Sequence, residues 1–225
     1  MLRAVIFDLH GTLVDDEPLR ARALLALARD AGLAPTAEDA AALHGLDDAN
    51  AVRKLLVRAG ARPGPDALRR LVAELRRRLA DEAPGGPPFH PGARELVEAA
   101  SRRWPVAVVA GSPRADATAL LKAGGIFRRL CALVTVDDAA TPSERALEIA
   151  LARTNEVLAR YHLPPVAPRE VAVFEDTEIG IAAARAAGMR AIGVGHTQDA
   201  ARFGEADAFF TRIGDVDAAT LERSI

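Results

Sequence analysis

Short apolar runs and longer amphipathic stretches follow one another along this chain. Val5, Ile6 and Phe7 form an apolar run that ends at Asp8 and is followed by Gly11, a residue typical of tight turns. This pattern predicts a buried strand that presents a carboxylate at its end. Beyond it, apolar residues recur with helical spacing, and prolines and glycines interrupt them. The spacing predicts helices over 19–31, 37–43, 48–59 and 66–82.

The second half of the chain alternates between the two kinds of pattern. It predicts helices over 94–103, 115–123, 143–161 and 179–187, and strands over 106–109, 132–136, 171–174, 191–194 and 208–210. Strands that alternate with helices favour a parallel sheet with helices on its faces. We therefore expect an α/β core domain of residues 1–15 and 89–225, into which residues 16–88 insert as a helical cap domain.

The composition is that of an ordinary water-soluble protein. With 225 residues, of which 50% are hydrophobic and 27% charged, the chain is long enough for one large core or for a core and a smaller lobe. A net charge of -2 gives no electrostatic reason to expect nucleic acid or an anionic membrane as a partner. No signal-peptide pattern and no apolar run of about 18 residues occurs, so we expect a cytoplasmic protein.

Two residue types are scarce enough to limit the chemistry. Cys131 is the only cysteine, which excludes an intramolecular disulfide and favours a small core residue over a nucleophile. Lys54 and Lys122 are the only lysines among 29 basic residues. A site that needs an ammonium group therefore has few candidates.

The loops that follow the predicted strands carry the candidate chemistry. In a parallel sheet the carboxyl ends of the strands border the ligand crevice, so Asp8 and the loops 110–114, 137–142 and 175–180 are expected there. The adjacent carboxylates Glu175 and Asp176 suit a hard, oxygen-ligated cation such as Mg²⁺.

Together these four segments resemble the four motifs of the haloacid dehalogenase (HAD) superfamily in order and spacing. The first motif is Asp8-Leu9-His10-Gly11-Thr12-Leu13-Val14-Asp15. The fourth, around Glu175 and Asp176, is similar to that of the phosphoglucomutase/phosphoglycolate phosphatase branch. The resemblance implies a Rossmann-like, doubly wound parallel sheet core with an inserted helical cap domain.

The resemblance also implies roles for the carboxylates. Asp8 stands where the family has its nucleophile, which attacks phosphorus and forms an aspartyl phosphate. Mg²⁺ would be held by Asp8, by the main-chain carbonyl of His10 and by Asp176, with Glu175 in support. A carbonyl ligand survives a change of its side chain, so the metal site is expected to persist.

His10 occupies the place of the aspartate that the family uses as general acid and base. An imidazole has an unperturbed pKa of about 6.5 and transfers protons near neutral pH. Its ring is longer than an aspartate side chain, however, and a neighbouring dication disfavours its protonated form.

The phosphate-binding positions also depart from the family pattern. Ala110 stands where a serine or threonine is usual, and Ser112, two residues later, is expected as a secondary contact or a helix cap. The amides of Gly111 and Ser112 would face an anion. Thr12 completes the phosphate-binding or substrate-binding positions of the first motif.

Thr141 stands where the third motif has a lysine before proline. Arg114 and Arg145 are the candidates to supply the missing charge, although a planar guanidinium does not copy the geometry of an ammonium. Lys122 is too far along its helix from Ser112, and Lys54 belongs to the cap.

Two hypotheses from different classes follow. The first is a divergent Mg²⁺-dependent HAD hydrolase that acts on a small, phosphorylated metabolite through Asp8 and His10, as a monomer or homodimer. The second, motivated by Ala110 and Thr141, is a catalytically impaired HAD-like binding or interaction protein. The remaining histidines are expected to be isolated surface or capping residues: His44, His90, His162 and His196.

Overall fold

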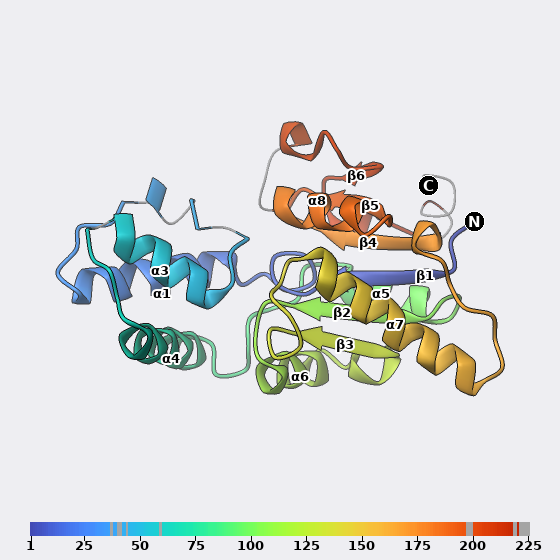
Figure 1. The fold of residues 1–225 in the computed structure, drawn as a ribbon, viewed down its shortest axis with the longest axis horizontal. Coiled ribbons are helices and arrows are strands. Elements are labelled where there is room, and N and C mark those ends of the chain that lie inside the picture. The colour runs from blue at the N-terminus through green and yellow to red at the C-terminus, as the bar shows by residue number, and fades with distance from the viewer. Residues whose placement is uncertain are drawn as a thin grey trace. The chain divides into compact units, whose positions relative to one another are not determined.

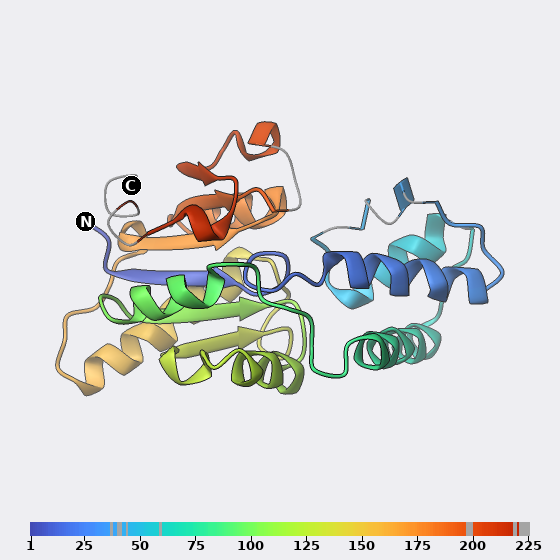
Figure 2. The ribbon, with the colours of Figure 1, turned by 180° about the vertical axis from the view of Figure 1, so that it is seen from behind.

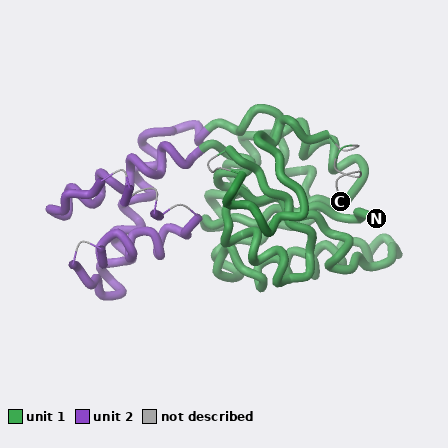
Figure 3. Tube along the Cα trace, turned by 90° about the horizontal axis from the view of Figure 1, so that it is seen from above, with its two compact units in different colours: residues 1–15, 88–225 green, residues 16–87 purple. Residues whose placement is uncertain are grey.

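A computed structural model describes residues 1–36, 38–39, 42–43, 45–58, 60–196, 200–217 and 220. The chain divides into two compact units, one made of residues 1–15 and 88–225 and the other of residues 16–87 (Figure 3). The predicted helix over 37–43 includes residues that lie outside this described part. Ala59, where the next helix was predicted to end, and His44 also lie outside it.

The first unit is built on a parallel sheet with the strand order β3-β2-β1-β4-β5-β6 (Figure 1). The strands are β1 (Ala4–Asp8), β2 (Val106–Ala110), β3 (Ala132–Thr135), β4 (Val171–Glu175), β5 (Arg190–Val194) and β6 (Ala208–Phe210). β1 pairs with β2 on one side and with β4 on the other. The first predicted strand is thus central in the sheet, and the predicted α/β class is confirmed.

Helices cover both faces of this sheet. They are α5 (Ala93–Ser101), α6 (Arg114–Ala123), α7 (Glu144–Arg160) and α8 (Glu178–Ala186). Figure 1 shows α7 and α8 on the near face, and Figure 2 shows α5 and α6 on the opposite one. Because successive strand residues point to opposite faces, Val5 and Phe7 pack with α5 and α6, whereas Ile6 packs with α7 and α8. Both faces of β1 are therefore buried, as its unbroken apolar run predicts.

Short 3₁₀ helices complete this unit: η1 (Phe127–Arg129), η2 (Pro168–Glu170), η3 (Ala200–Phe203) and η4 (Ile213–Asp215). Two strand ends differ from the sequence prediction in a way that concerns the site. β2 extends to Ala110 and β4 extends to Glu175, so both residues belong to strands rather than to the loops that follow.

The second unit is helical. It contains α1 (Glu17–Asp30), α3 (Asp48–Arg58) and α4 (Pro65–Glu82), which share an apolar core that includes Leu27, Leu55 and Leu75. The Asp48 carboxylate on α3 forms ion pairs with Arg20 on α1, at 3.2 Å, and with Arg76 on α4, at 3.0 Å. These two ion pairs join α3 to both of the other helices.

The chain leaves and re-enters the first unit through two adjacent segments. Val14 pairs with Phe89 in an antiparallel bridge, the Asp15 amide donates to the Pro88 carbonyl at 2.8 Å, and the His90 amide donates to the Leu13 carbonyl at 2.9 Å. The two connections are therefore joined by hydrogen bonds close to the end of β1. Among the described residues, no helix combines the length and the apolar character needed to cross a membrane.

Candidate active site

The strand order β3-β2-β1-β4 places all four segments singled out in the sequence at the ends of consecutive strands. Asp8 ends β1, and the neighbouring strands end at Ala110 on β2 and at Glu175 on β4. Asp8 is in register with Val109, and Phe7 is in register with Phe174, against whose ring its own ring is stacked at 4.8 Å. These central strands therefore hold their terminal residues at one edge of the sheet.

The carboxylates at this edge form a cluster. Asp8, Glu175 and Asp176 each offer an oxygen, and these oxygens lie within 4.8 Å of one another. Glu175 and Asp176 are buried, and Asp8 is partly buried. The separation of 167 positions between Asp8 and Glu175 is closed entirely by the pairing of β1 with β4.

Two threonines brace the cluster. The buried Thr12 hydroxyl donates to Oδ1 of Asp176 at 3.2 Å. The Thr177 hydroxyl donates to Oε2 of Glu175 at 3.0 Å and accepts from the Gly180 amide at 3.0 Å, so it also caps the N-terminus of α8. Thr12, expected among the phosphate-binding or substrate-binding positions, thus contacts a candidate metal ligand.

Two glycines leave room for these carboxylates. Gly11 has a φ of 85°, and a Cβ placed on it would lie 2.2 Å from Oδ2 of Asp176. A Cβ on Gly180 would lie 1.9 Å from the carboxyl carbon of Glu175. The backbone of the first motif and the first turn of α8 therefore approach the acids as closely as only glycine permits.

The electrostatics of the cluster favour a cation. Burial raises the pKa of Glu175, and the adjacent Asp176 raises it further. Closely spaced buried carboxylates need a positive charge if they are all to ionise. Three carboxylates also form the hard oxygen donor set that Mg²⁺ prefers. The residues present therefore fit the divalent ion that the sequence analysis expects.

The structure places His10 against Ser112. Nε2 of His10 and Oγ of Ser112 are 2.8 Å apart, and the two residues follow adjacent strands. Sequence spacing gave no signal for this contact, because it depends on the pairing of β1 with β2.

Ala110, at the end of β2, and Thr141, in the loop after β3, are uncharged, and we call this part of the site its neutral side. Ala110 is fully buried, and its carbonyl accepts a hydrogen bond from the Thr141 hydroxyl at 3.3 Å. A Cβ on Gly111 would lie 3.5 Å from the same hydroxyl oxygen. Thr141, which is 5% exposed, therefore uses its hydroxyl on the backbone of the neighbouring loop.

The two arginines considered as replacements for the missing lysine are held by carboxylates. Arg114 pairs with Asp138, which also accepts from Arg153 at 2.6 Å. The hydrogen bond from Arg153, followed by the Thr135 amide and the charge of Arg114, lowers the pKa of Asp138 to about 2. Arg145 is 73% exposed and pairs with Glu148. The charge-replacement hypothesis therefore has no support from the pairing of either arginine.

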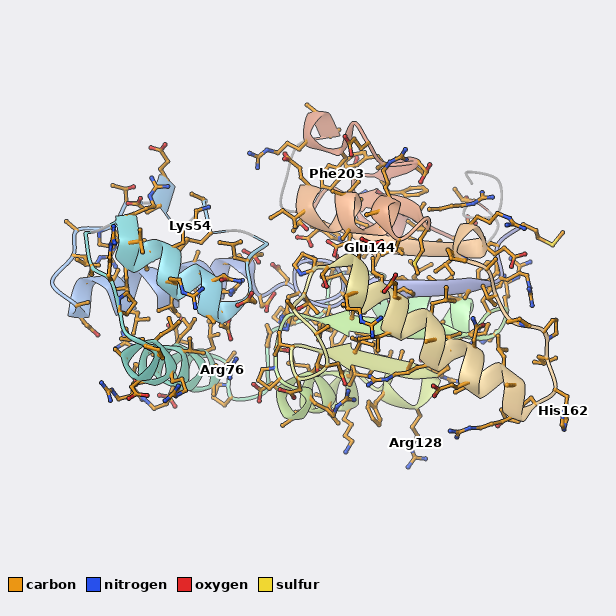
Figure 4. The ribbon with its side chains drawn as sticks, in the orientation of Figure 1. Lys54, Arg76, Arg128, Glu144, His162 and Phe203 are labelled. Atoms are coloured by element: carbon orange, nitrogen blue, oxygen red, sulfur yellow. The ribbon has the colours of Figure 1, made fainter. Side chains whose placement is uncertain are left out.

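The lysines are also engaged elsewhere. The ammonium of Lys122 lies 5.5 Å from the centre of the Phe127 ring. Lys54, labelled on α3 in Figure 4, donates to the Ala42 carbonyl at 2.9 Å within the second unit.

Two histidines expected to be isolated lie together. The rings of His90 and His196 are stacked at 3.7 Å, and Nε2 of His196 accepts from the Ile213 amide. Burial, followed by the charge of His90, lowers the pKa of His196 to about 4. His90 is 8% exposed, so the expectation of a surface or capping residue is wrong for it. His162, labelled in Figure 4, is exposed and lies two residues after the end of α7.

Fold and site together define an α/β protein whose candidate site is a carboxylate cluster at the ends of parallel strands. The chain belongs to the haloacid dehalogenase-like hydrolases, whose family model matches residues 2–188. The resemblance stated from the motifs is thereby confirmed.

Similar proteins are known both from sequence and from structure. The chain is 28% identical to the validoxylamine A 7'-phosphate phosphatase of Streptomyces hygroscopicus subsp. limoneus, with 96% of each chain covered. It is 31% identical to the fructose-1-phosphate phosphatase of Escherichia coli K12, over 84% of this chain and 95% of that one. It shares its fold with a β-phosphoglucomutase from Clostridium difficile, at a TM-score of 0.82 and 19% identity, over 100% of this chain and 97% of the other.

Proposed function

We propose that this chain is a Mg²⁺-dependent phosphatase that hydrolyses a small phosphorylated metabolite. The observation that carries the proposal is the cluster of Asp8, Glu175 and Asp176, whose oxygens lie within 4.8 Å of one another at the strand ends. Membership of a hydrolase family and similarity to proteins named as sugar phosphate and related phosphatases support the reaction type.

In this proposal Asp8 is the nucleophile. Its carboxylate attacks phosphorus, an aspartyl phosphate forms, and the alcohol of the substrate leaves with a proton from His10. Water then attacks the same phosphorus and gives a proton to His10. This attack breaks the bond between Asp8 and phosphorus, so phosphate is released and the Asp8 carboxylate is restored. Atoms and protons balance over the two steps, and the net reaction is hydrolysis.

Asp8, the main-chain carbonyl of His10 and Asp176 would hold Mg²⁺, with Glu175 in support. The ion, when bound, would supply Lewis-acid stabilisation of the charge on the transferring phosphoryl group. Thr12 and Thr177 hold the acidic side chains by hydrogen bonds, so they position Asp176 and Glu175 for this role.

The phosphate-binding side would rely on backbone groups. We propose that the Gly111 and Ser112 amides, which precede α6, face the anion, with Thr12, Ala110, Arg114 and Thr141 around them. We further propose that residues 16–87 act as the cap that selects the substrate.

The test measures phosphate release from a panel of sugar phosphates and short organic phosphates, with Mg²⁺ or with EDTA. Turnover that needs Mg²⁺ and falls roughly a thousandfold or more in Asp8→Asn supports the proposal, because this change removes the nucleophile. The melting temperature of Asp8→Asn serves as the control for folding. Full activity in Asp8→Asn on any substrate found would exclude the proposed chemistry.

A second candidate function is a non-catalytic binding protein. It is favoured by the residues at two positions where the resemblance implies phosphate binding: the Ala110 side chain has no hydrogen-bond donor, and the Thr141 hydroxyl donates to the Ala110 carbonyl. Binding of phosphate esters that calorimetry detects, without turnover and without any dependence on Asp8, would favour this candidate. Mg²⁺-dependent turnover that His10→Ala lowers roughly a hundredfold or more would eliminate it.

A further inference from the structure

Ser112 has one contact that the proposed phosphatase reaction does not explain. Its hydroxyl oxygen lies 2.8 Å from Nε2 of His10, across a separation of 102 positions in the chain. Ser112 is 9% exposed, and it follows β2, while His10 follows β1. The contact therefore joins the residue proposed as acid and base to the neighbouring strand-end loop.

The backbone beside His10 is fixed by other hydrogen bonds. The Leu9 amide donates to the Val109 carbonyl at 3.1 Å, and the Gly11 amide donates to the Val14 carbonyl at 2.9 Å. These contacts do not orient the imidazole, because the terminal torsion of a histidine is broad and roughly two-fold. A hydrogen bond to a ring nitrogen is what selects the ring orientation and the tautomer.

The loop that carries Ser112 is anchored on both sides. Before it, the Ala110 carbonyl accepts from the Thr141 hydroxyl at 3.3 Å. After it, the Arg114 amide donates to Oδ2 of Asp137 at 2.8 Å. The Ser112 hydroxyl is thus presented to the imidazole from a segment whose backbone is hydrogen-bonded to the loop after β3.

We propose that Ser112 is a positioning residue whose hydroxyl holds the His10 imidazole in the orientation required for proton transfer. This role rests on the proposed function of His10 as acid and base. It differs from the substrate contact expected of Ser112, because the Ser112 hydroxyl acts through His10 and not on the phosphate.

Kinetics with the substrate found in the panel separate the two roles. Ser112→Ala should lower kcat about ten- to a hundredfold, since a misplaced acid and base loses most of its effect. KM should change less than about threefold, because ground-state binding is not affected. Ser112→Thr, which keeps the hydroxyl, should restore most of the kcat, and Ser101→Ala on α5 should behave as wild type.

A double-mutant cycle with His10→Ala provides the decisive kinetic comparison. If Ser112 acts through His10, Ser112→Ala should have almost no further effect once His10 is alanine. Two results would show direct substrate binding and overturn the proposal. One is a raised KM in Ser112→Ala, and the other is a fall in kcat from Ser112→Ala that is as large in the His10→Ala background as in the wild type.

A second measurement does not depend on turnover. The chain has five histidines, so ring nitrogen signals in ¹⁵N-histidine-labelled protein are few, and His10→Asn assigns those of His10. Ser112→Ala should shift the ring signals of His10 toward a mixture of tautomers, while Ser112→Thr and Ser101→Ala should leave them in place.

The two measurements distinguish failure of the inference from failure of the proposed function. His10 ring signals that are unchanged in Ser112→Ala would overturn the positioning role, whether or not a substrate has been found. Ring signals that depend on Ser112 in a protein without turnover would count against the phosphatase proposal and support the positioning of His10.

Discussion

The acidic side and the neutral side of the strand-end site are built in different ways. On the acidic side, at the ends of β1 and β4, Asp8, Glu175 and Asp176 gather within 4.8 Å, and threonine hydroxyls support two of them. On the neutral side, at the end of β2 and after β3, Ala110 and Thr141 contact each other through a carbonyl and a hydroxyl.

The difference separates the two tasks of such a site. The acidic side has the donor set for a divalent cation. Beside the neutral side, Arg114, four residues after Ala110, is paired with Asp138. In the proposed function, holding a metal and neutralising a phosphate would therefore depend on residues of different strands. We expect a bound cation and backbone amides to carry most of the anion recognition.

The largest expected effect comes from breaking the acidic side with Asp176→Asn. Activity should fall roughly a thousandfold or more, because a proposed ligand is lost. Mg²⁺ at a hundredfold excess over its Kd should stabilise the wild type by about 2.7 kcal/mol, and this gain should be lost in the variant. Without metal the variant should be more stable than the wild type, since burial, followed by the charge of Asp176, disfavours ionisation of Glu175 and raises its pKa, and the variant lacks that charge.

Differential scanning calorimetry with and without Mg²⁺ measures both parts of this prediction. Glu178→Gln is the matched control, because Glu178 is exposed two residues further along on α8. If Mg²⁺ stabilised Asp176→Asn as much as the wild type, this result would contradict the assignment of the acidic side as the metal site.

A smaller effect is expected from adding charge to the neutral side with Thr141→Lys. A charged hydrogen bond to an oxyanion contributes about 1.5–3 kcal/mol, so vanadate or phosphate should bind ten- to a hundredfold more tightly. Thr141→Met is the control for side-chain length without charge. Binding can be followed by calorimetry in the presence of Mg²⁺, and equal affinities for the Lys and Met variants would show that charge is not what the neutral side lacks.

The sequence predicts the acidic side better than the contacts around it. The apolar run of β1 and the strand-helix alternation are local patterns, so they predict the sheet, and parallel pairing then places Asp8 beside Glu175. The hydrogen bond between His10 and Ser112 and the stack of His90 on His196 depend on side-chain orientation across distant segments. Periodicity carries no information on such orientations, which is why His90 and His196 were expected to be isolated.

Asp138→Asn tests whether the ion pair with Asp138 keeps the charge of Arg114 from the neutral side of the site. The Asp138 carboxylate, 14% exposed, gains its partners only in the folded protein, and its pKa is lowered to about 2. Its stabilisation is therefore complete above about pH 4, where the unfolded carboxyl is ionised, and is lost as the pH falls toward about 2. The variant should be less stable than wild type by about 1–2 kcal/mol at pH 7, and this difference should vanish near pH 2.

Urea unfolding at several pH values checks this dependence, with Glu148→Gln as a control for an exposed arginine partner. A stability difference that is the same at pH 7 and near pH 2 would exclude the paired carboxylate as its origin. Tighter phosphate binding in Asp138→Asn would show that releasing Arg114 restores a cation to the neutral side.

The smallest effect compares the caps of the two helices that follow the two sides. Ser143 caps α7, where its hydroxyl accepts from the Ala146 amide at 3.2 Å, and Thr177 caps α8 in the same way. Each hydroxyl also donates once, that of Ser143 to the exposed Ala140 carbonyl and that of Thr177 to the buried Glu175. Loss of an N-cap costs about 1 kcal/mol, so Ser143→Ala should lower the free energy of unfolding by about that amount. Thr177→Ala should cost about 1 kcal/mol more, because the buried Glu175 also loses its hydroxyl donor.

Urea unfolding without metal measures both variants, and Thr177→Ser, which keeps the hydroxyl, should recover most of the loss. Equal losses in Thr177→Ala and Ser143→Ala would mean that the hydroxyl contributes nothing to the acidic side beyond capping its helix.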